Sequence, residues 1–215
     1  VQSREYSHQE EIANSISHAF GVLLGIIAGF FLLQKAFQSQ QPVIIIAVSI
    51  YLLGMLSSYI IQVIITIYPQ ALKTTAPKLD HAAIYLHIAG TYTPLTLISL
   101  QKEKTWMWFI LTFIWLFAFI GIAISLKKSE KHSHIKTICY VLMGCFILVA
   151  FKPLIDALNA TNKIAVLWWI IAGGISYIIG AVFFSLVQRK YTHTIFHFFV
   201  LIGSVCHIIA IYLLL

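Results

Sequence analysis

Long apolar stretches alternate with short polar segments along the whole chain. Each apolar stretch is close to the roughly 20 mostly apolar residues that a transmembrane helix needs. The polar segments between them carry charges and the helix breakers Pro and Asn. The pattern therefore predicts an all-α integral membrane protein, a bundle of seven transmembrane helices that forms one domain over residues 1–215. The expected helices cover about residues 15–37, 42–67, 81–100, 106–126, 135–155, 164–187 and 193–215.

Composition favours a membrane over an aqueous environment. Hydrophobic residues make up 60% of the chain and charged residues 10%, whereas an average soluble domain carries about 25% charged residues. The formal net charge of +7 would be typical of a nucleic-acid-binding protein if a soluble basic face existed to carry it. We expect no such face and no nucleic-acid partner, and we place the excess positive charge at the membrane surface.

The distribution of Lys and Arg indicates an orientation, because these residues are enriched in cytoplasmic loops. With seven helices the two termini lie on opposite sides of the membrane. If the N-terminus is cytoplasmic, the outer segments hold five of the 14 Lys and Arg residues. The inner segments then hold the other nine: Arg4, Lys73, Lys78, Lys127, Lys128, Lys131, Lys136, Arg189 and Lys190. This bias predicts a cytoplasmic N-terminus and a C-terminus outside.

Polar residues at membrane depth are costly and therefore need a partner or a function. His193 and His197 lie four residues apart, so they share one face at the start of the last helix. Asp80 opens the third helix, and Ser58 and Gln62 lie toward the end of the second. In an alternating bundle these places are on one side of the membrane, here the cytoplasmic side. The entry to the first helix adds polar residues to the same layer: Glu10, Glu11, Asn14 and His18.

The spacing H-x-x-x-H on a helix can direct two imidazoles toward one zinc ion. The alternative is a pair of interfacial histidines that bond to the backbone and to lipid headgroups, since two histidines at this spacing also occur by chance. The convergence of Asp80 and Ser58 on the pair strengthens the metal interpretation, and both alternatives stay open. Two further histidines lie deeper in the membrane. His87 either lines a cavity below the layer or, as we prefer, bonds a neighbouring helix, and we interpret His207 as structural.

Three segments carry a family resemblance. They are EEIANSISHAFG in the first helix, KLDHAAIYLHIAGTYTP in the third and HTIFHFFVLIGSVCHIIAIYL in the seventh. With these segments the chain resembles the bacterial haemolysin III family, which belongs with the progestin and adipoQ receptors, including the adiponectin receptors. The resemblance covers nearly the whole chain. It implies seven helices, a cytoplasmic N-terminus, a place in the bacterial cell (inner) membrane and a zinc ion near the cytoplasmic leaflet.

The resemblance also implies roles for individual residues. In the family, a histidine from an S-x-x-x-H motif of helix 2 and the H-x-x-x-H pair of helix 7 hold the zinc, while an aspartate at the start of helix 3 positions a water molecule. The pair matches His193 and His197, the aspartate matches Asp80, and the motif serine matches Ser58. Gln62 stands where the family has its helix 2 histidine. An amide oxygen is a poor zinc ligand beside imidazole, so zinc is expected to bind weakly or not at all unless Asp80 or another group joins the ligands.

Three functions follow as alternatives. The first is a zinc-dependent hydrolase of a lipid amide or ester, similar to the alkaline ceramidases, in which Asp80 and Ser58 are catalytic and a membrane lipid or lipid-like molecule is bound. The second is a receptor-like binding or sensing protein with a structural or vestigial metal site, which Gln62 favours. The third, membrane lysis by pore formation, is disfavoured because no helix shows a continuous polar stripe. Serine hydrolysis has no support, since no G-x-S-x-G motif is present.

Overall fold

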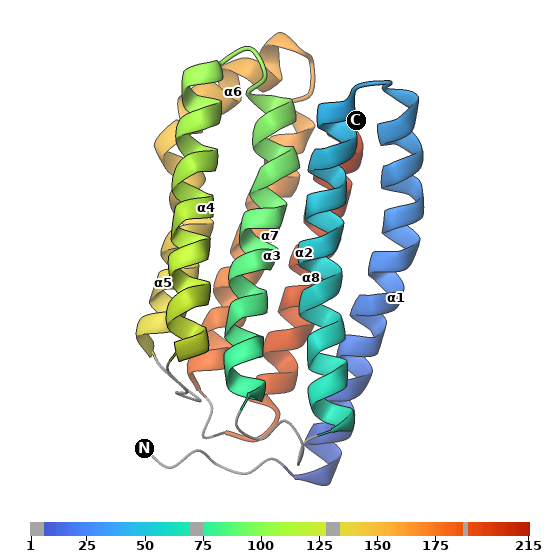
Figure 1. Ribbon diagram of the computed structural model, residues 1–215, viewed down its shortest axis with the longest axis vertical. Helices are drawn as coiled ribbons and strands as arrows, with labels where there is room; N and C mark the ends of the chain where they lie inside the picture. The colour runs from blue at the N-terminus through green and yellow to red at the C-terminus, as the bar shows by residue number, and fades with distance from the viewer. Residues whose placement is uncertain (1–6, 69–74, 128–133, 187–188) are drawn as a thin grey trace.

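The computed structural model describes residues 7–68, 75–127, 134–186 and 189–215. Within these residues every regular element is a helix. In Figure 1 the long helices run side by side along the vertical axis and form one upright bundle. The elements are α1 (His8–Gln38), α2 (Pro42–Ile67), α3 (Ala76–Ser99), α4 (Lys104–Lys127), α5 (His134–Cys145), the 3-10 helix η1 (Phe146–Ala150), α6 (Phe151–Ala160), α7 (Ala165–Ser185) and α8 (Thr192–Leu214).

Six helical segments of the described residues are long and apolar enough to cross a membrane. They are Gln9–Gln38, Pro42–Ile67, Lys104–Lys127, Ile135–Ala160, Ala165–Ser185 and Thr192–Leu214. The chain is therefore a multi-pass integral membrane protein, and the prediction of an all-α membrane bundle is confirmed at this level.

The helix that these six leave out is α3, which is more polar. It packs against α2, α4, α5, α6 and α8 and lies in the middle of the view in Figure 1. None of its side chains from Lys78 to Ser99 is exposed. Because neighbouring helices shield α3, it can carry polar residues that would be costly on a lipid-facing helix.

Two helices begin earlier than the apolar pattern predicts. α1 begins at His8, where Ser7 and Glu10 form a reciprocal capping box that satisfies backbone N–H groups of the first turn. α3 begins at Ala76, so Asp80 lies in its second turn instead of opening the helix. The first turn of α1 is polar and that of α3 contains a proline and a lysine, so hydropathy alone does not detect either turn.

The predicted fifth helix, residues 135–155, is divided into α5, η1 and α6. Tyr92 of α3 stabilises the division, because its hydroxyl donates to the Gly144 carbonyl at 2.7 Å and accepts from the Ile147 backbone N–H at 3.0 Å. The side chain thus satisfies backbone groups that the interrupted helix leaves without their usual partners.

The helix then continues further than expected. α6 extends to Ala160, so the predicted loop over residues 156–163 is wrong for residues 156–160. The Lys152 ammonium lies 2.5 Å from the Asp156 carboxylate, one turn apart on the same face, a spacing that supports a helix. The residues Asp, Asn and Ala of this segment therefore form the last turns of a helix.

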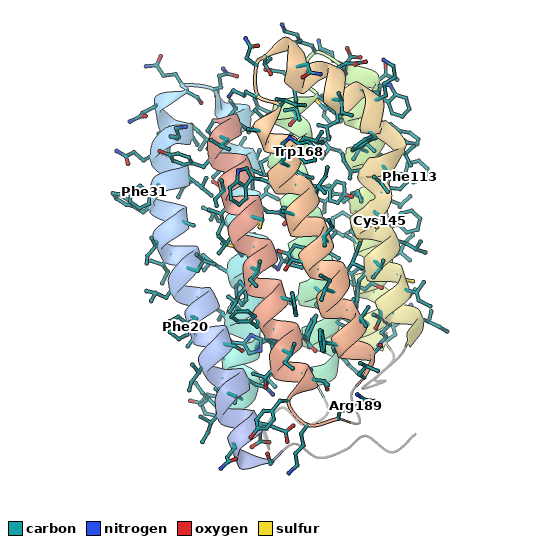
Figure 2. All side chains as sticks on the ribbon, turned by 180° about the vertical axis from the view of Figure 1, so that it is seen from behind. Phe20, Phe31, Phe113, Cys145, Trp168 and Arg189 are labelled. Carbon is teal, nitrogen blue, oxygen red and sulfur yellow. The ribbon has the colours of Figure 1, made fainter. Side chains whose placement is uncertain are left out.

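The outer surface of the bundle is apolar. In Figure 2 Phe20 and Phe31 of α1 point away from the bundle, as does Trp168 of α7. Phe20 is 61% exposed and Trp168 is 66% exposed. Exposure of large apolar side chains to water costs about 25 cal/mol per Å², whereas contact with lipid chains does not. This surface fits a protein surrounded by lipid.

Lysine side chains cover the end of α8. α8 begins at the end of the bundle where α1 begins and ends at the opposite end (Figure 1). There the Lys35 ammonium donates to the Tyr212 carbonyl at 2.9 Å and lies 4.0 Å from the centre of the Tyr212 ring. The Lys163 ammonium donates to the Leu214 carbonyl. Cations at a helix C-terminus stabilise its unpaired carbonyls. Partial burial lowers the pKa of Lys163, and the charge of Lys35 lowers this pKa further.

The opposite end of the bundle carries the residues on which the orientation prediction depends. Arg189 lies there (Figure 2). Arg4, Lys73, Lys128 and Lys131 lie outside the described residues. The cytoplasmic position of this end stays a prediction.

Candidate functional site

A row of polar side chains on α1 contacts the beginning of α8. Glu10, Asn14 and His18 are four residues apart, so they share one face of α1; we call them the α1 polar row. The Glu10 carboxylate, 1% exposed, accepts from the Tyr191 backbone N–H at 2.8 Å. The Thr194 hydroxyl donates to the Asn14 amide oxygen at 2.7 Å. The row therefore fixes the position of α8 against α1.

The third member of the row contacts the histidine pair of α8. The ring centres of His18 and His197 are 4.0 Å apart, and those of His193 and His197 are 4.3 Å apart. Three imidazoles from two helices thus form one group, which we call the histidine cluster. The Nδ1 atom of His18 and the Nε2 atom of His197 are buried and have no hydrogen-bond partner among the described residues. Leaving such atoms unpaired costs about 1–3 kcal/mol each.

Side chains of α2 and α3 lie at the same end of the bundle. The Gln62 amide N–H donates to the Asp80 carboxylate, and Ser58 precedes Gln62 by one helical turn. Ser58, Gln62, Asp80, His18 and His197 all line one cavity. The sequence placed these polar groups in one layer, and the structure brings them together. His193 contacts His197 from beside this cavity without lining it.

The histidine cluster fits zinc in the chemistry of its donors. Imidazole nitrogens are common zinc ligands, and structural or catalytic sites use three or four such donors. Two of the cluster's buried nitrogens have no hydrogen-bond partner among the described residues. Such nitrogens are chemically suited to serve as metal ligands. Among the residues that the structure describes, however, no group of three His, Cys, Asp or Glu side chains is arranged to hold an ion.

The cavity has a volume of about 190 Å³, more than ten times the roughly 10–15 Å³ that one water molecule needs. It extends inward from the polar layer between α2, α3, α5, α7 and α8, and its wall is mostly apolar. Gly144 of α5, which is exposed, and Ile178 of α7, which is 41% exposed, also line it. The cavity therefore opens between α5 and α7 toward the apolar outer surface.

A second group of polar side chains lines the inner part of the cavity. The hydroxyls of Tyr59 and Tyr177 lie 2.9 and 3.0 Å from the Ser204 hydroxyl. His87 and His207 line the cavity beside them. His87 lines the cavity, as one of the two interpretations from the sequence expects, and its buried Nε2 atom has no hydrogen-bond partner among the described residues.

The sequence predicts His18 to lie in the polar layer, but no ligand role was expected for it. The detectable signal is the repeat of polar residues every fourth position in an otherwise apolar helix, E-x-x-x-N-x-x-x-H. Such a stripe indicates a buried face. Which helix covers that face depends on the packing of α1, which the sequence does not contain.

We expect Asn14→Leu to lower the stability of the protein by about 1 kcal/mol, because the Thr194 hydroxyl loses its partner at an interhelical contact. Ser15→Leu is the matched control, since Ser15 is partly exposed and, among the described residues, bonds to the backbone of its own helix. The check is thermal unfolding in detergent. Equal midpoints for the two variants would show that the α1 polar row does not hold α8.

Comparison with known proteins identifies relatives along nearly the whole chain. A family model described as Haemolysin-III related matches residues 6–208. A protein named Hemolysin-3 from Bacillus cereus is 36% identical over 197 residues, which cover 91% of this chain and 87% of that protein. A Hemolysin-3 homolog from Bacillus subtilis (strain 168) is 32% identical over 200 residues, covering 93% and 91%.

The similarity extends to mammals. The human protein named Monocyte to macrophage differentiation factor is 27% identical over 214 residues, which cover 94% of this chain and 83% of that protein. The family match over residues 6–208 spans the helices that carry the polar layer, from α1 to α8.

Proposed function

Because this chain belongs to the haemolysin III family, we propose that it is a membrane-embedded, zinc-dependent hydrolase of a lipid amide or ester. The observation that carries the proposal is a single cavity that has His18 and His197 of the histidine cluster, together with Asp80, at one end and an opening to the apolar surface. A mostly apolar concavity with a few convergent polar groups is the usual form of a ligand site. An amphiphile would place its head in the polar layer and its chain in the apolar part.

The proposed topology has seven membrane-crossing helices, with α3 as the seventh. The 24 residues of α3 extend about 36 Å at 1.5 Å per residue, more than the roughly 30 Å of a bilayer's hydrocarbon core. In this arrangement the N-terminus is cytoplasmic and the C-terminus is outside. The polar layer then lies near the cytoplasmic leaflet, in the inner membrane of a bacterial cell.

His193 and His197 would hold the zinc ion in this proposal. His18 would supply a third imidazole in place of the helix 2 histidine that Gln62 replaces, since its ring already lies 4.0 Å from that of His197. Zinc in such a set supplies Lewis-acid chemistry, which makes water nucleophilic near neutral pH and polarises a carbonyl.

The neighbouring polar groups have distinct roles in the proposed hydrolysis. The Asp80 carboxylate accepts the proton of the attacking water, and the Gln62 amide, which donates to that carboxylate, keeps it directed into the cavity. The Ser58 hydroxyl, on the wall of the same cavity, donates to the oxygen on which negative charge develops. Stabilisation of such an oxyanion by a positioned donor typically accelerates hydrolysis.

Gly174→Leu is expected to obstruct the cavity and to abolish lipid binding while leaving the fold intact. Gly174 lines the cavity, and a Cβ atom there would meet nothing within 4 Å. A leucine side chain at this position would therefore extend into the cavity and occupy the space of the ligand. Ala172→Leu is the matched control, because Ala172 is exposed on the same helix and does not line the cavity. Binding of a fluorescent fatty alcohol in nanodiscs measures the effect. Normal binding by Gly174→Leu would place the lipid elsewhere.

Turnover tests the proposal itself. Purified protein should cleave a fluorogenic dodecanoyl ester or amide, lose this activity with a chelator and regain it when zinc is added. The receptor-like alternative is favoured by the Gln62–Asp80 hydrogen bond, because it engages the group that hydrolysis requires. On that alternative the protein binds lipid and zinc but releases no product in any condition, and the hydrolase proposal fails.

A further inference from the structure

The inner end of the cavity holds polar groups that the proposed hydrolysis does not use. His87 of α3 and His207 of α8 both line the cavity, and the centres of their rings lie 6.4 and 5.4 Å from the centre of the Tyr177 ring. His87 follows Asp80 by seven residues and His207 follows His197 by ten. At 1.5 Å per residue these separations are about 10 and 15 Å. The two histidines, which we call the inner histidine pair, are therefore a polar site separate from the polar layer.

The inner histidine pair has unused hydrogen-bonding capacity. The Nε2 atom of His87 and the Nδ1 atom of His207 are buried and have no partner among the described residues. The Nε2 atom of His207 faces the Ile170 carbonyl at 3.4 Å, so this nitrogen carries the proton and Nδ1 is left as an acceptor. A neutral His87 offers one donor and one acceptor. Since buried polar groups are nearly always hydrogen-bonded, the pair suits a ligand group that both donates and accepts.

We infer that the inner histidine pair binds a hydroxyl group in the middle of a lipid chain, so that the ligand is a chain-hydroxylated amphiphile. This inference rests on the proposed binding of a lipid in the cavity. The hydroxyl donates to Nδ1 of His207 and accepts from His87. The separation of about 10–15 Å from the polar layer corresponds to roughly 8–12 bonds of an extended chain, since a carbon–carbon bond is about 1.5 Å long and the chain zigzags. The hydroxyl is thus expected near the tenth carbon.

The neighbouring hydroxyls do not compete for this role. Tyr59 and Tyr177 both bond to Ser204, so their groups already have partners. Water has room beside the inner histidine pair when no lipid is bound. A chain hydroxyl that displaces this water keeps its hydrogen bonds, whereas a plain methylene displaces it and leaves both nitrogens unpaired. The cavity should therefore discriminate between hydroxylated and plain chains.

The test compares two lipids that cannot be hydrolysed, so that binding is measured apart from turnover. Protein in nanodiscs is titrated with octadecan-1-ol and with the diol that carries a second hydroxyl on its tenth carbon, each competing against a fluorescent fatty alcohol. Empty nanodiscs correct for partitioning. We expect the diol to bind on the order of tenfold more tightly. His87→Leu should remove this preference, and His87→Gln should retain it because an amide also donates and accepts.

The wild-type comparison is decisive even if a variant fails to fold. Equal binding of the two lipids overturns the inference and leaves lipid binding intact, with water as the occupant beside the histidines. A preference that persists in folded His87→Leu also overturns it, because the discrimination then arises elsewhere. Failure of both lipids to bind removes the proposed lipid site as well.

Discussion

Asp80→Ala is expected to reduce hydrolysis of a fluorogenic dodecanoyl ester by on the order of 10²–10⁴-fold, the usual contribution of a general base, without loss of zinc. The Asp80 carboxylate lines the cavity beside the histidine cluster, but it is not one of the proposed zinc ligands. Its removal therefore deprives water of a proton acceptor while the proposed ligands stay in place. The measurements are initial rates and zinc content of the same preparation.

The matched control is Asp156→Ala, which removes an exposed carboxylate at the opposite end of the bundle, where it bonds only to Lys152 among the described residues. This variant should hydrolyse the ester at the wild-type rate. If Asp80→Ala also retained the wild-type rate, Asp80 would have no part in proton transfer. If it lost zinc together with activity, Asp80 would be a ligand and the assignment of roles would change.

Gln62→His should tighten zinc binding by roughly 10–100-fold, the scale on which the groups around a metal centre alter its affinity. Gln62 lines the cavity with His18 and His197, and an imidazole there adds a donor that zinc prefers to an amide oxygen. Competition with a fluorescent zinc chelator gives the dissociation constant of each variant.

Thr66→His provides the control, because it adds an imidazole to α2 one turn beyond Gln62, at a position that does not line the cavity. We expect its zinc affinity to equal that of the wild type. Unchanged affinity in Gln62→His would mean that residue 62 does not face the metal and that the α2 register inferred from the family motif is wrong.

The polar layer could be predicted from the sequence because it depends on two local rules. The spacing of His193 and His197 puts both on one face of a helix, whatever the fold. The alternation of helix direction then brings the start of α3, the end of α2 and the start of α8 to the same end of the bundle. The lining of one cavity by Asp80, Ser58 and His197 follows from these two rules.

The contacts between helices could not be predicted, because they depend on tertiary packing. Gly21 shows this: a Cβ atom there would lie 2.3 Å from the Tyr59 ring, so the absence of a side chain lets α1 approach α2. His18 lies three residues before Gly21 on α1, and its ring contacts that of His197. The sequence shows the glycine and the histidine but not the ring that the glycine accommodates. The division between α5 and α6 depends likewise on Tyr92, a residue of another helix.

The central claim is that the histidine cluster binds zinc, and elemental analysis of the purified protein in detergent tests it most directly. We predict close to one zinc per chain in the wild type and none in His193→Ala/His197→Ala, with partial loss in His18→Ala because the third imidazole is removed. Zinc content that is unaffected by the double substitution would place any metal elsewhere. Absence of zinc from wild-type protein supplied with the metal would contradict the account, and the function would then have to be sought in lipid binding.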